Sequence, residues 1–201
     1  MTVSNSERLY AHYRELFLKL NHAQIAKKLH LTYDDNHLYV PFFNRPFSVN
    51  RHTADVDSPL YKDHNFYCEK LLILHHLYFS KADAENSGHM VAFRDLRECS
   101  DFEPAYQKTT LLPFASYFSG KTQLLKERAT HIGGQLDTCG DVSFTVDAFP
   151  RISLQFIFWD GDEEFSANAN ILFDKHIAQF IHPESVSVLA NVGVSILMSN
   201  S

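Results

Sequence analysis

The apolar residues at the start of the chain recur every three or four positions, which predicts an amphipathic helix over residues 4–21. Ser or Asn followed three residues later by Glu or Gln is typical of a helix N-terminus. Asn21 with Gln24 and Ser100 with Glu103 show this pattern. Together these signals predict further helices over residues 21–29, 63–79 and 122–132, and from residues 100 and 183 onward.

Two other segments alternate apolar and polar residues, which is the period of a half-buried β-strand. The first covers residues 31–50 and turns at Asp34-Asp35-Asn36, where short polar side chains tolerate a tight backbone. The second covers residues 142–165 and turns at Pro150-Arg151. Two antiparallel β-hairpins packed with several helices predict a fold of the α+β class.

Two prolines interrupt the predicted elements by removing a backbone donor. Pro41 cannot donate to a strand ladder, so we expect an edge or a bulge at that point of its strand. Pro113 is expected to kink or split the helix that begins near residue 100.

Composition narrows the class of protein. The 201 residues are 45% hydrophobic and 21% charged, as in an ordinary folded protein, and the length suits a single domain over residues 1–201. A net charge of −6 without a run of Lys or Arg argues against nucleic-acid binding. The N-terminus lacks a signal-peptide pattern, and the longest apolar stretch, 71–79, is far shorter than the ~20 residues that span a bilayer. We therefore expect a cytoplasmic protein without a membrane contact.

The three cysteines lie far apart in the sequence, at Cys68, Cys99 and Cys139. Without a C-x-x-C pair they predict free thiols and no iron–sulfur cluster within this chain. A glycine-rich phosphate loop, a G-x-S-x-G elbow and an H-E-x-x-H motif are also missing from the sequence.

The first candidate site is an acidic corner after the second hairpin, where four carboxylates fall within residues 160–164 and aromatic residues flank them. Like charges this close repel unless a cation, hydrogen-bond donors or water offset them. One interpretation makes them oxygen ligands, or makes one a general acid or base with a raised pKa. The alternative is a solvated hairpin turn, for which Asp-Gly is the typical dipeptide. The candidate ligand-binding residues in and after this corner are Trp159, Asp160, Asp162, Glu163, Glu164, Phe165, Asn168, Asn170, Phe173 and Asp174.

The second candidate site is the His75-His76 doublet within the apolar segment LLILHHL. Adjacent helical residues point ~100° apart, so the two imidazoles cannot easily share one metal ion. One interpretation is a core histidine that forms a hydrogen bond, and the alternatives are a metal or axial ligand and a proton carrier. His182, directly before Pro183, is expected to belong to a helix cap and to be neutral there.

Four segments of the chain resemble a known family. They are YDDNHLYVPFFNRPFSV (Tyr33–Val49), LLILHHL (Leu71–Leu77), VAFRDL (Val91–Leu96) and FWDGDEEFSANANILFD (Phe158–Asp174). In this order they are similar to the domain-of-unknown-function family numbered 3786, found mostly in anaerobic bacteria and archaea, and the resemblance runs from about Asn21 to Leu197. It implies neither a settled activity nor established functional residues.

The resemblance also implies an association. Some members resemble two-part proteins in which this domain follows an iron–sulfur module like that of corrinoid iron–sulfur proteins. The resemblance therefore implies that this domain acts together with a corrinoid, another tetrapyrrole or an iron–sulfur redox protein. The present chain has no cluster-binding cysteines, so any cluster would belong to a partner.

Three hypotheses of function follow. The first is a non-enzymatic ligand-binding or accessory domain, whose ligand is a tetrapyrrole or another small molecule. Its pocket would lie between the LLILHHL helix and the acidic corner, with Trp159, Phe165 and Phe173 as apolar walls. The second is an enzyme in which a His and carboxylates hold a divalent metal ion that activates water or polarises a carbonyl. The third is a module that binds another protein through its aromatic surface.

Overall fold

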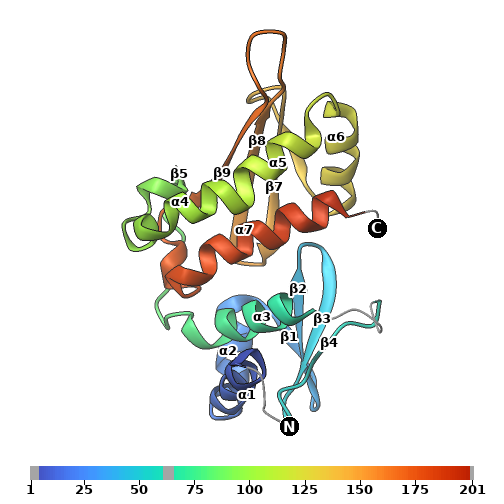
Figure 1. Ribbon diagram of the computed structural model, residues 1–201. Coiled ribbons are helices and arrows are strands. Elements are labelled where there is room, and N and C mark those ends of the chain that lie inside the picture. The colour runs from blue at the N-terminus through green and yellow to red at the C-terminus, as the bar shows by residue number, and fades with distance from the viewer. Residues whose placement is uncertain (1–4, 61–65, 200–201) are drawn as a thin grey trace.

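The computed structural model describes residues 5–60 and 66–199, and it confirms the α+β class. Figure 1 shows a lower tier, formed by α1–α3 and β1–β4, and an upper tier, formed by β5–β9 and α4–α6, with α7 between them. The lower tier consists of α1 (Asn5–Leu18), α2 (His22–Leu29), β1 (Thr32–Tyr33), β2 (His37–Phe42), β3 (Arg45–Asn50), β4 (Val56–Asp57) and α3 (Tyr67–Phe79). The predicted start of the 63–79 helix lies outside the described residues.

The upper tier follows in the sequence. Its strands are β5 (Met90–Ala92), β6 (Gln135–Asp137), β7 (Val142–Phe149), β8 (Ile152–Trp159) and β9 (Asn168–Asp174). Its helical segments are η1 (Phe93–Asp95), η2 (Arg97–Phe102), α4 (Glu103–Tyr106), η3 (Gln107–Leu111), α5 (Leu112–Phe118), α6 (Thr122–His131) and η4 (Ile177–Gln179), and the chain then forms α7 (Pro183–Met198). Among the described residues, no helix combines the length and the apolarity needed to cross a membrane.

The four-stranded antiparallel sheet has the order β1-β2-β3-β4 and contains the first predicted hairpin. Its turn forms because Asp34 Oδ1 accepts hydrogen bonds from the backbone N–H groups of Asn36 and His37, both at 2.7 Å. Pro41 faces Pro46 across the ladder and lies beyond the short strand β1, so it occupies a free edge, as predicted.

The β2–β3 turn connects the two tiers. Its residues Phe43 and Asn44 both have positive φ, 46° and 57°, as a two-residue type I′ turn requires. Phe43 is a bulky residue for this conformation, but its side chain is fully buried, and its N–H donates to the Ala148 carbonyl of β7 at 3.1 Å. The Phe42 and Phe149 rings also meet, 4.8 Å apart. The apolar core is therefore continuous from one tier to the other.

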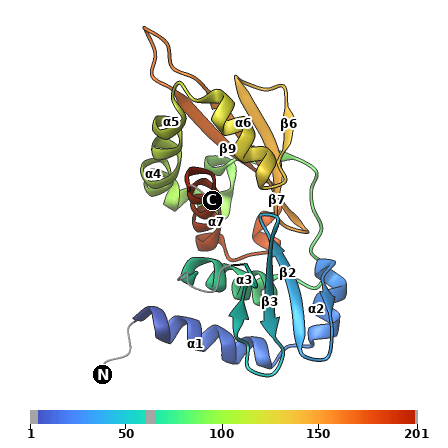
Figure 2. The same ribbon diagram turned by 90° about the vertical axis from the view of Figure 1, so that its right-hand side faces the viewer.

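The five-stranded antiparallel sheet has the order β5-β9-β8-β7-β6 and contains the second predicted hairpin. Alternate residues Val142, Phe144 and Val146 are buried, as their period predicts. Helices cover this face of the sheet (Figure 2), with the Phe114 ring of α5 against Phe156 of β8 at 5.8 Å. Most alternating positions on the opposite face of β7 hold polar side chains, namely Ser143, Thr145 and Asp147.

The segment from Glu103 to Phe118 shows the predicted effect of Pro113. A π-helical segment, η3, separates α4 from α5. Pro113 has no N–H for the Thr109 carbonyl, and Nδ2 of Asn191 on α7 donates to that carbonyl instead, at 2.8 Å. The predicted helix start at Ser100 is wrong, because a 3-10 segment continues to Phe102 and the Ser100 hydroxyl donates to the carbonyl of Arg97 at 3.2 Å.

Helix α7 packs against both tiers. It begins at Pro183 as predicted, and the Glu184 N–H donates to Nδ1 of His182 at 3.3 Å, which confirms His182 as a cap residue. At Gly193 a Cβ atom would lie 2.9 Å from the Phe43 ring and 3.2 Å from the Phe156 ring. The missing side chain of Gly193 therefore lets α7 approach the lower-tier hairpin and the upper-tier sheet together.

Candidate functional site

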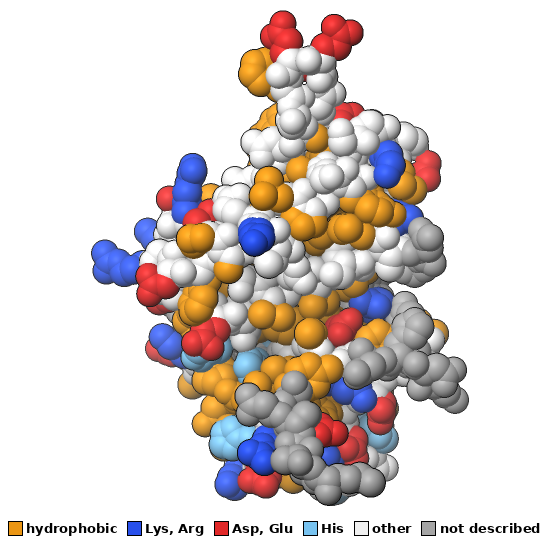
Figure 3. Space-filling view, in the orientation of Figure 1, with side chains coloured by type: hydrophobic (Ala, Val, Ile, Leu, Met, Phe, Trp, Pro, Cys, Tyr) orange, Lys and Arg blue, Asp and Glu red, His pale blue; other side chains and the backbone are white. Residues whose placement is uncertain are grey.

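The acidic corner is a loop that projects from the upper tier, with acidic side chains at its tip (Figure 3). Asp162 shapes the tip, because its Oδ1 accepts hydrogen bonds from the N–H groups of Phe165 and Glu164, each at 2.8 Å, and these bonds lower the pKa of Asp162. Glu163 and Glu164 are exposed, and Phe165 is 70% exposed. The solvated-turn interpretation describes this loop, so the rings do not shelter the carboxylates.

Asp160 has a structural contact at the base of the loop. Its Oδ1 accepts from the N–H of Gly120, between α5 and α6, at 2.8 Å. Its own N–H donates to Oδ2 of Asp141 at 2.7 Å. Asp160 therefore fixes the projecting loop to the body of the upper tier.

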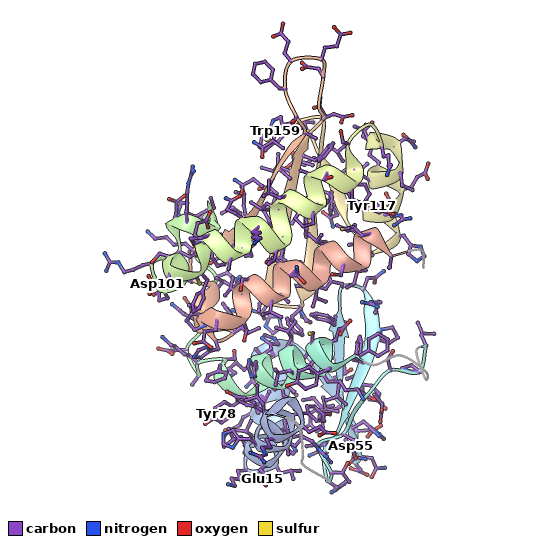
Figure 4. All side chains as sticks on the ribbon, viewed as in Figure 1. Glu15, Asp55, Tyr78, Asp101, Tyr117 and Trp159 are labelled. Atoms are coloured by element: carbon purple, nitrogen blue, oxygen red, sulfur yellow. The ribbon has the colours of Figure 1, made fainter. Side chains whose placement is uncertain are left out.

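The two candidate sites do not meet, so the predicted pocket between them is wrong. Figure 4 shows Tyr78 of α3 in the lower tier and Trp159 near the base of the projecting loop. The His76 imidazole stacks on Phe149, at the opposite end of the β7–β8 hairpin from Trp159. Seven steps along β8, from Ile152 to Trp159, cover roughly 23 Å at about 3.3 Å per residue. The length of the strand therefore keeps the doublet away from the acidic corner.

Both histidines of the doublet are buried in the core. Nδ1 of His75 lies 2.6 Å from Oγ of Ser185, and Nδ1 of His76 lies 3.0 Å from the carbonyl oxygen of Phe180. Loss of water around each imidazole lowers its pKa to about 4, so both are neutral at pH 7. Each ring thus has one hydrogen bond through Nδ1, while its buried Nε2 has no partner among the described residues.

Phe173 and Asp174 are also parts of the body of the fold. Phe173 is fully buried against Phe93. Burial alone would raise the pKa of Asp174, but hydrogen bonds from Ser87 and from the N–H of His176 outweigh it and lower that pKa. Asp174 therefore organises the loop before β5.

The remaining candidates, Trp159, Asn168 and Asn170, line a pocket of about 250 Å³ at the edge of the upper-tier sheet. The pocket lies where β5 ends, between η1, the α4–η3 segment and the ends of β8 and β9. Its other lining residues are Ala92, Phe93, Arg94, Glu103, Tyr106, Gln107, Leu111 and Ala169. We call it the Tyr106 pocket.

Two buried oxygen atoms of this lining have no hydrogen-bond partner among the described residues: Oη of Tyr106 and Oε2 of Glu103. The Tyr106 side chain is 1% exposed, and its ring stacks on Phe93 at 4.2 Å. Burial raises the pKa of Tyr106 well above its ordinary value, and the nearby Glu103 adds to this effect, so the phenol is neutral. Buried polar groups are nearly always paired, and an unpaired one costs about 1–3 kcal/mol. These two oxygens therefore mark the Tyr106 pocket as the strongest candidate site.

Gln107 orients the Glu103 carboxylate. Its Nε2 donates to Oε1 of Glu103 at 2.7 Å, which leaves Oε2 as the unpaired oxygen. Gln107 begins the π-helical segment η3, and Leu111, at the end of η3, also lines the pocket. Short π-helical segments are frequent at functional sites.

The free edge of β9 forms another wall. Strand β5 pairs with β9 only from Leu172 to Asp174. Before that point the N–H groups of Ala169 and Ile171 donate to the side-chain oxygens of Asn168 and Asn170, at 2.8 and 2.9 Å. The asparagines thus cap an exposed edge, and each keeps an Nδ2 group without a hydrogen bond in the described part of the chain.

A larger groove of about 600 Å³ lies on the lower-tier sheet, between Tyr39 and Phe66. Several of its polar side chains already have partners. The Tyr39 hydroxyl donates to Oδ2 of Asp34 at 2.6 Å, and Nζ of Lys70 lies 3.9 Å from Oδ1 of Asp57. Without an unpaired buried atom, this groove is a weaker candidate than the Tyr106 pocket.

No three His, Cys, Asp or Glu side chains gather closely enough to hold a metal ion within residues 5–60 and 66–199. The three cysteines are free thiols, with Cys99 buried and Cys68 and Cys139 exposed.

Sequence reasoning missed Arg94, Glu103, Tyr106 and Gln107. Glu103 was interpreted as part of a helix-capping pair, and the buried Tyr106 has no distinctive neighbours in the sequence. One available signal was the set of segments that carry the family resemblance. Two of them, 91–96 and 158–174, both contribute to the lining of the pocket.

Two antiparallel sheets joined by a shared helix, with a small polar pocket at one sheet edge, define the structural class of this α+β domain. The chain belongs to the family described as "Domain of unknown function (DUF3786)", which matches residues 21–195. No curated protein and no solved structure matches the chain.

Proposed function

We propose that this protein is a non-enzymatic binding or accessory domain that holds a small polar ligand in the Tyr106 pocket. The observation that supports this proposal is the pair of buried, unpaired oxygens, Tyr106 Oη and Glu103 Oε2. A ligand that donates to Oε2 and bonds with the phenol removes the cost of leaving both atoms without water or a partner. Binding free energy would therefore come mainly from polar contacts.

The size of the pocket limits the ligand. About 250 Å³ is below the ~300–1,000 Å³ of sites for drug-sized molecules, so the ligand has few heavy atoms. A tetrapyrrole is larger than a typical drug and does not fit there. The association with a corrinoid or an iron–sulfur redox protein stays a prediction, and such a partner would contact another surface of the domain.

A thermal-shift screen of the intact protein against small polar compounds tests the proposal. A compound at ~100 times its Kd adds about 2.7 kcal/mol, or roughly 5–10 °C in Tm for a chain of this size. We expect Tyr106→Phe and Glu103→Gln to reduce the shift strongly, because each removes one of the two polar partners. Tyr39→Phe, in the larger groove, is the matched control and should keep the shift.

Two outcomes would contradict the proposal. One is a screen in which no compound raises the Tm of the wild-type protein. The other is a shift that persists in both pocket variants and disappears in Tyr39→Phe, because the ligand would then occupy the groove on the lower-tier sheet.

A further inference from the structure

We infer that the ligand is a small zwitterion of the α-amino acid class, with its ammonium group at Glu103 and its carboxylate group toward Arg94. This inference rests on the proposed function and names the chemical class of the ligand. It follows from the distribution of charges and of unpaired donors and acceptors around the Tyr106 pocket.

The Glu103 wall is suited to a cationic donor. In the described part of the chain, no Lys, Arg or His nitrogen lies within 4.0 Å of its carboxylate, and only the neutral amide of Gln107 bonds to it. Oε2 is buried and lacks a donor. An ammonium group carries three donors and a positive charge, so it can serve Oε2 and the lone pairs of the neutral Tyr106 hydroxyl together.

Other residues of the lining are suited to an anionic acceptor. Arg94 lines the pocket from η1 and forms no ion pair with the described carboxylates. The Nδ2 groups of Asn168 and Asn170 add donors, because their Oδ1 atoms are already occupied by backbone N–H groups. A guanidinium fork with neighbouring amide donors matches a carboxylate.

Because a positive and a negative side chain line one small pocket, they favour a ligand that carries both charges. A carboxylic acid without an amine leaves the buried Oε2 of Glu103 unpaired. Arg94 and Asn168 are exposed and can pair with water, so an amine without a carboxylate loses only the added attraction of these groups. Sites with buried polar groups discriminate strongly against ligands that lack the complementary group. Trp159 and Leu111 supply an apolar wall for the ligand's side chain.

Isothermal titration of the intact protein with the twenty common α-amino acids tests this inference. For the tightest binder, the amine that lacks the carboxylate and the acid that lacks the amine are titrated in parallel. We expect the amino acid to bind at least about tenfold more tightly than either matched compound. Glu103→Gln should weaken binding by roughly 30-fold or more, because it removes one partner of a buried charged pair.

Arg94→Gln should also weaken binding of the amino acid, but it should leave binding of the matched amine unchanged. Arg97→Gln is the matched control, because Arg97 is exposed like Arg94 but lies on the next 3-10 segment and does not line the pocket. The Tm of each ligand-free variant shows whether the protein still folds.

The contrary results distinguish a wrong zwitterion assignment from a wrong ligand-binding function. If the matched amine or acid binds as tightly as the amino acid, the zwitterion assignment is overturned while the proposed ligand-binding function stands. If a small compound of another class binds and both Tyr106→Phe and Glu103→Gln abolish that binding, the assignment is overturned in the same way. If no small polar compound binds and ordered water alone satisfies the two oxygens, the inference and the proposed function fail together.

Discussion

Nδ1 of His75 lies 2.6 Å from Oγ of Ser185, and this hydrogen bond joins α3 of the lower tier to the first turn of α7. Both side chains are almost inaccessible to water, at 9% and 5% exposure. The Tyr13 ring packs against the imidazole in an edge arrangement, with the two ring centroids 4.1 Å apart. The pair is therefore a buried connection between two helices.

Ser185→Ala should lower the free energy of unfolding by about 1–3 kcal/mol, because it leaves Nδ1 of a buried histidine without a partner. Ser187→Ala is the matched control on the same helix, since the Ser187 hydroxyl donates only to the carbonyl of Glu184. We expect this control to change stability by no more than about 0.5 kcal/mol. Urea denaturation at pH 7.5 measures both values, and equal losses in the two variants would show that the His75–Ser185 bond contributes nothing.

Stability should decrease as the pH falls from about 6.5 toward 4, because His75 and His76 are neutral in the folded protein. Burial lowers the pKa of His76 from 6.5 to about 4, so the unfolded chain binds protons in this range and the folded chain does not. The shift corresponds to roughly 3 kcal/mol for His76 at the low end of the range. Above pH 6.5 the imidazole is neutral in both the folded and the unfolded chain, so this loss of stability is absent.

A comparison of unfolding free energies at pH 7.5 and pH 4.5 tests this dependence. His76→Phe should flatten the pH dependence, whereas His131→Gln, at an exposed position of α6, should preserve it. A wild-type protein equally stable at both pH values would contradict the assignment of two neutral core histidines.

Gly193→Ala should destabilise the protein by roughly 1 kcal/mol, although alanine favours helices. Alanine gains about 1 kcal/mol in helix propensity over glycine. Against this, its Cβ would lie 2.9 Å from the buried Phe43 ring, and overpacking a core typically costs about 1–3 kcal/mol. Thermal unfolding measures the net effect, and a raised Tm would show that the ring moves aside without cost.

Tyr106→Phe should leave the ligand-free protein as stable as the wild type or slightly more stable. The substitution removes a buried hydroxyl that has no partner among residues 5–60 and 66–199, and it keeps the ring on Phe93. A binding site commonly sacrifices stability in this way. Chemical denaturation without added ligand measures it, and a loss above about 1 kcal/mol would mean that the hydroxyl has a structural partner.

Local signals in the sequence located most of the elements. The Asn21–Gln24 pair marks the start of α2, where the Gln24 N–H donates to Oδ1 of Asn21 at 3.1 Å. The alternation of apolar and polar residues over 142–158 predicted the hairpin of β7 and β8. These features depend on residues that are close in the sequence, so the pattern alone could reveal them. Strand β4 has only two residues, too few to show a period, although its partner β3 is close in the sequence. Strand β5 has three residues and depends on the distant strand β9, so it also escaped prediction.

The candidate site was only partly predictable, for a related reason. Trp159, Asn168 and Asn170 were singled out because they flank the acidic corner, but the corner itself is solvated. Glu103 and Tyr106 reach the same pocket from more than 50 residues away in the sequence, because the Tyr106 ring of α4 packs against Phe173 of β9. No periodicity encodes such a long-range contact.

The position of Gly193 between Phe43 and Phe156 also bears on the order in which the protein is made. A ribosome synthesises both sheets before it reaches residues 183–198, so the apolar surfaces that α7 joins stay uncovered until α7 is made. A chain truncated before α7 would expose these surfaces and would be prone to aggregation.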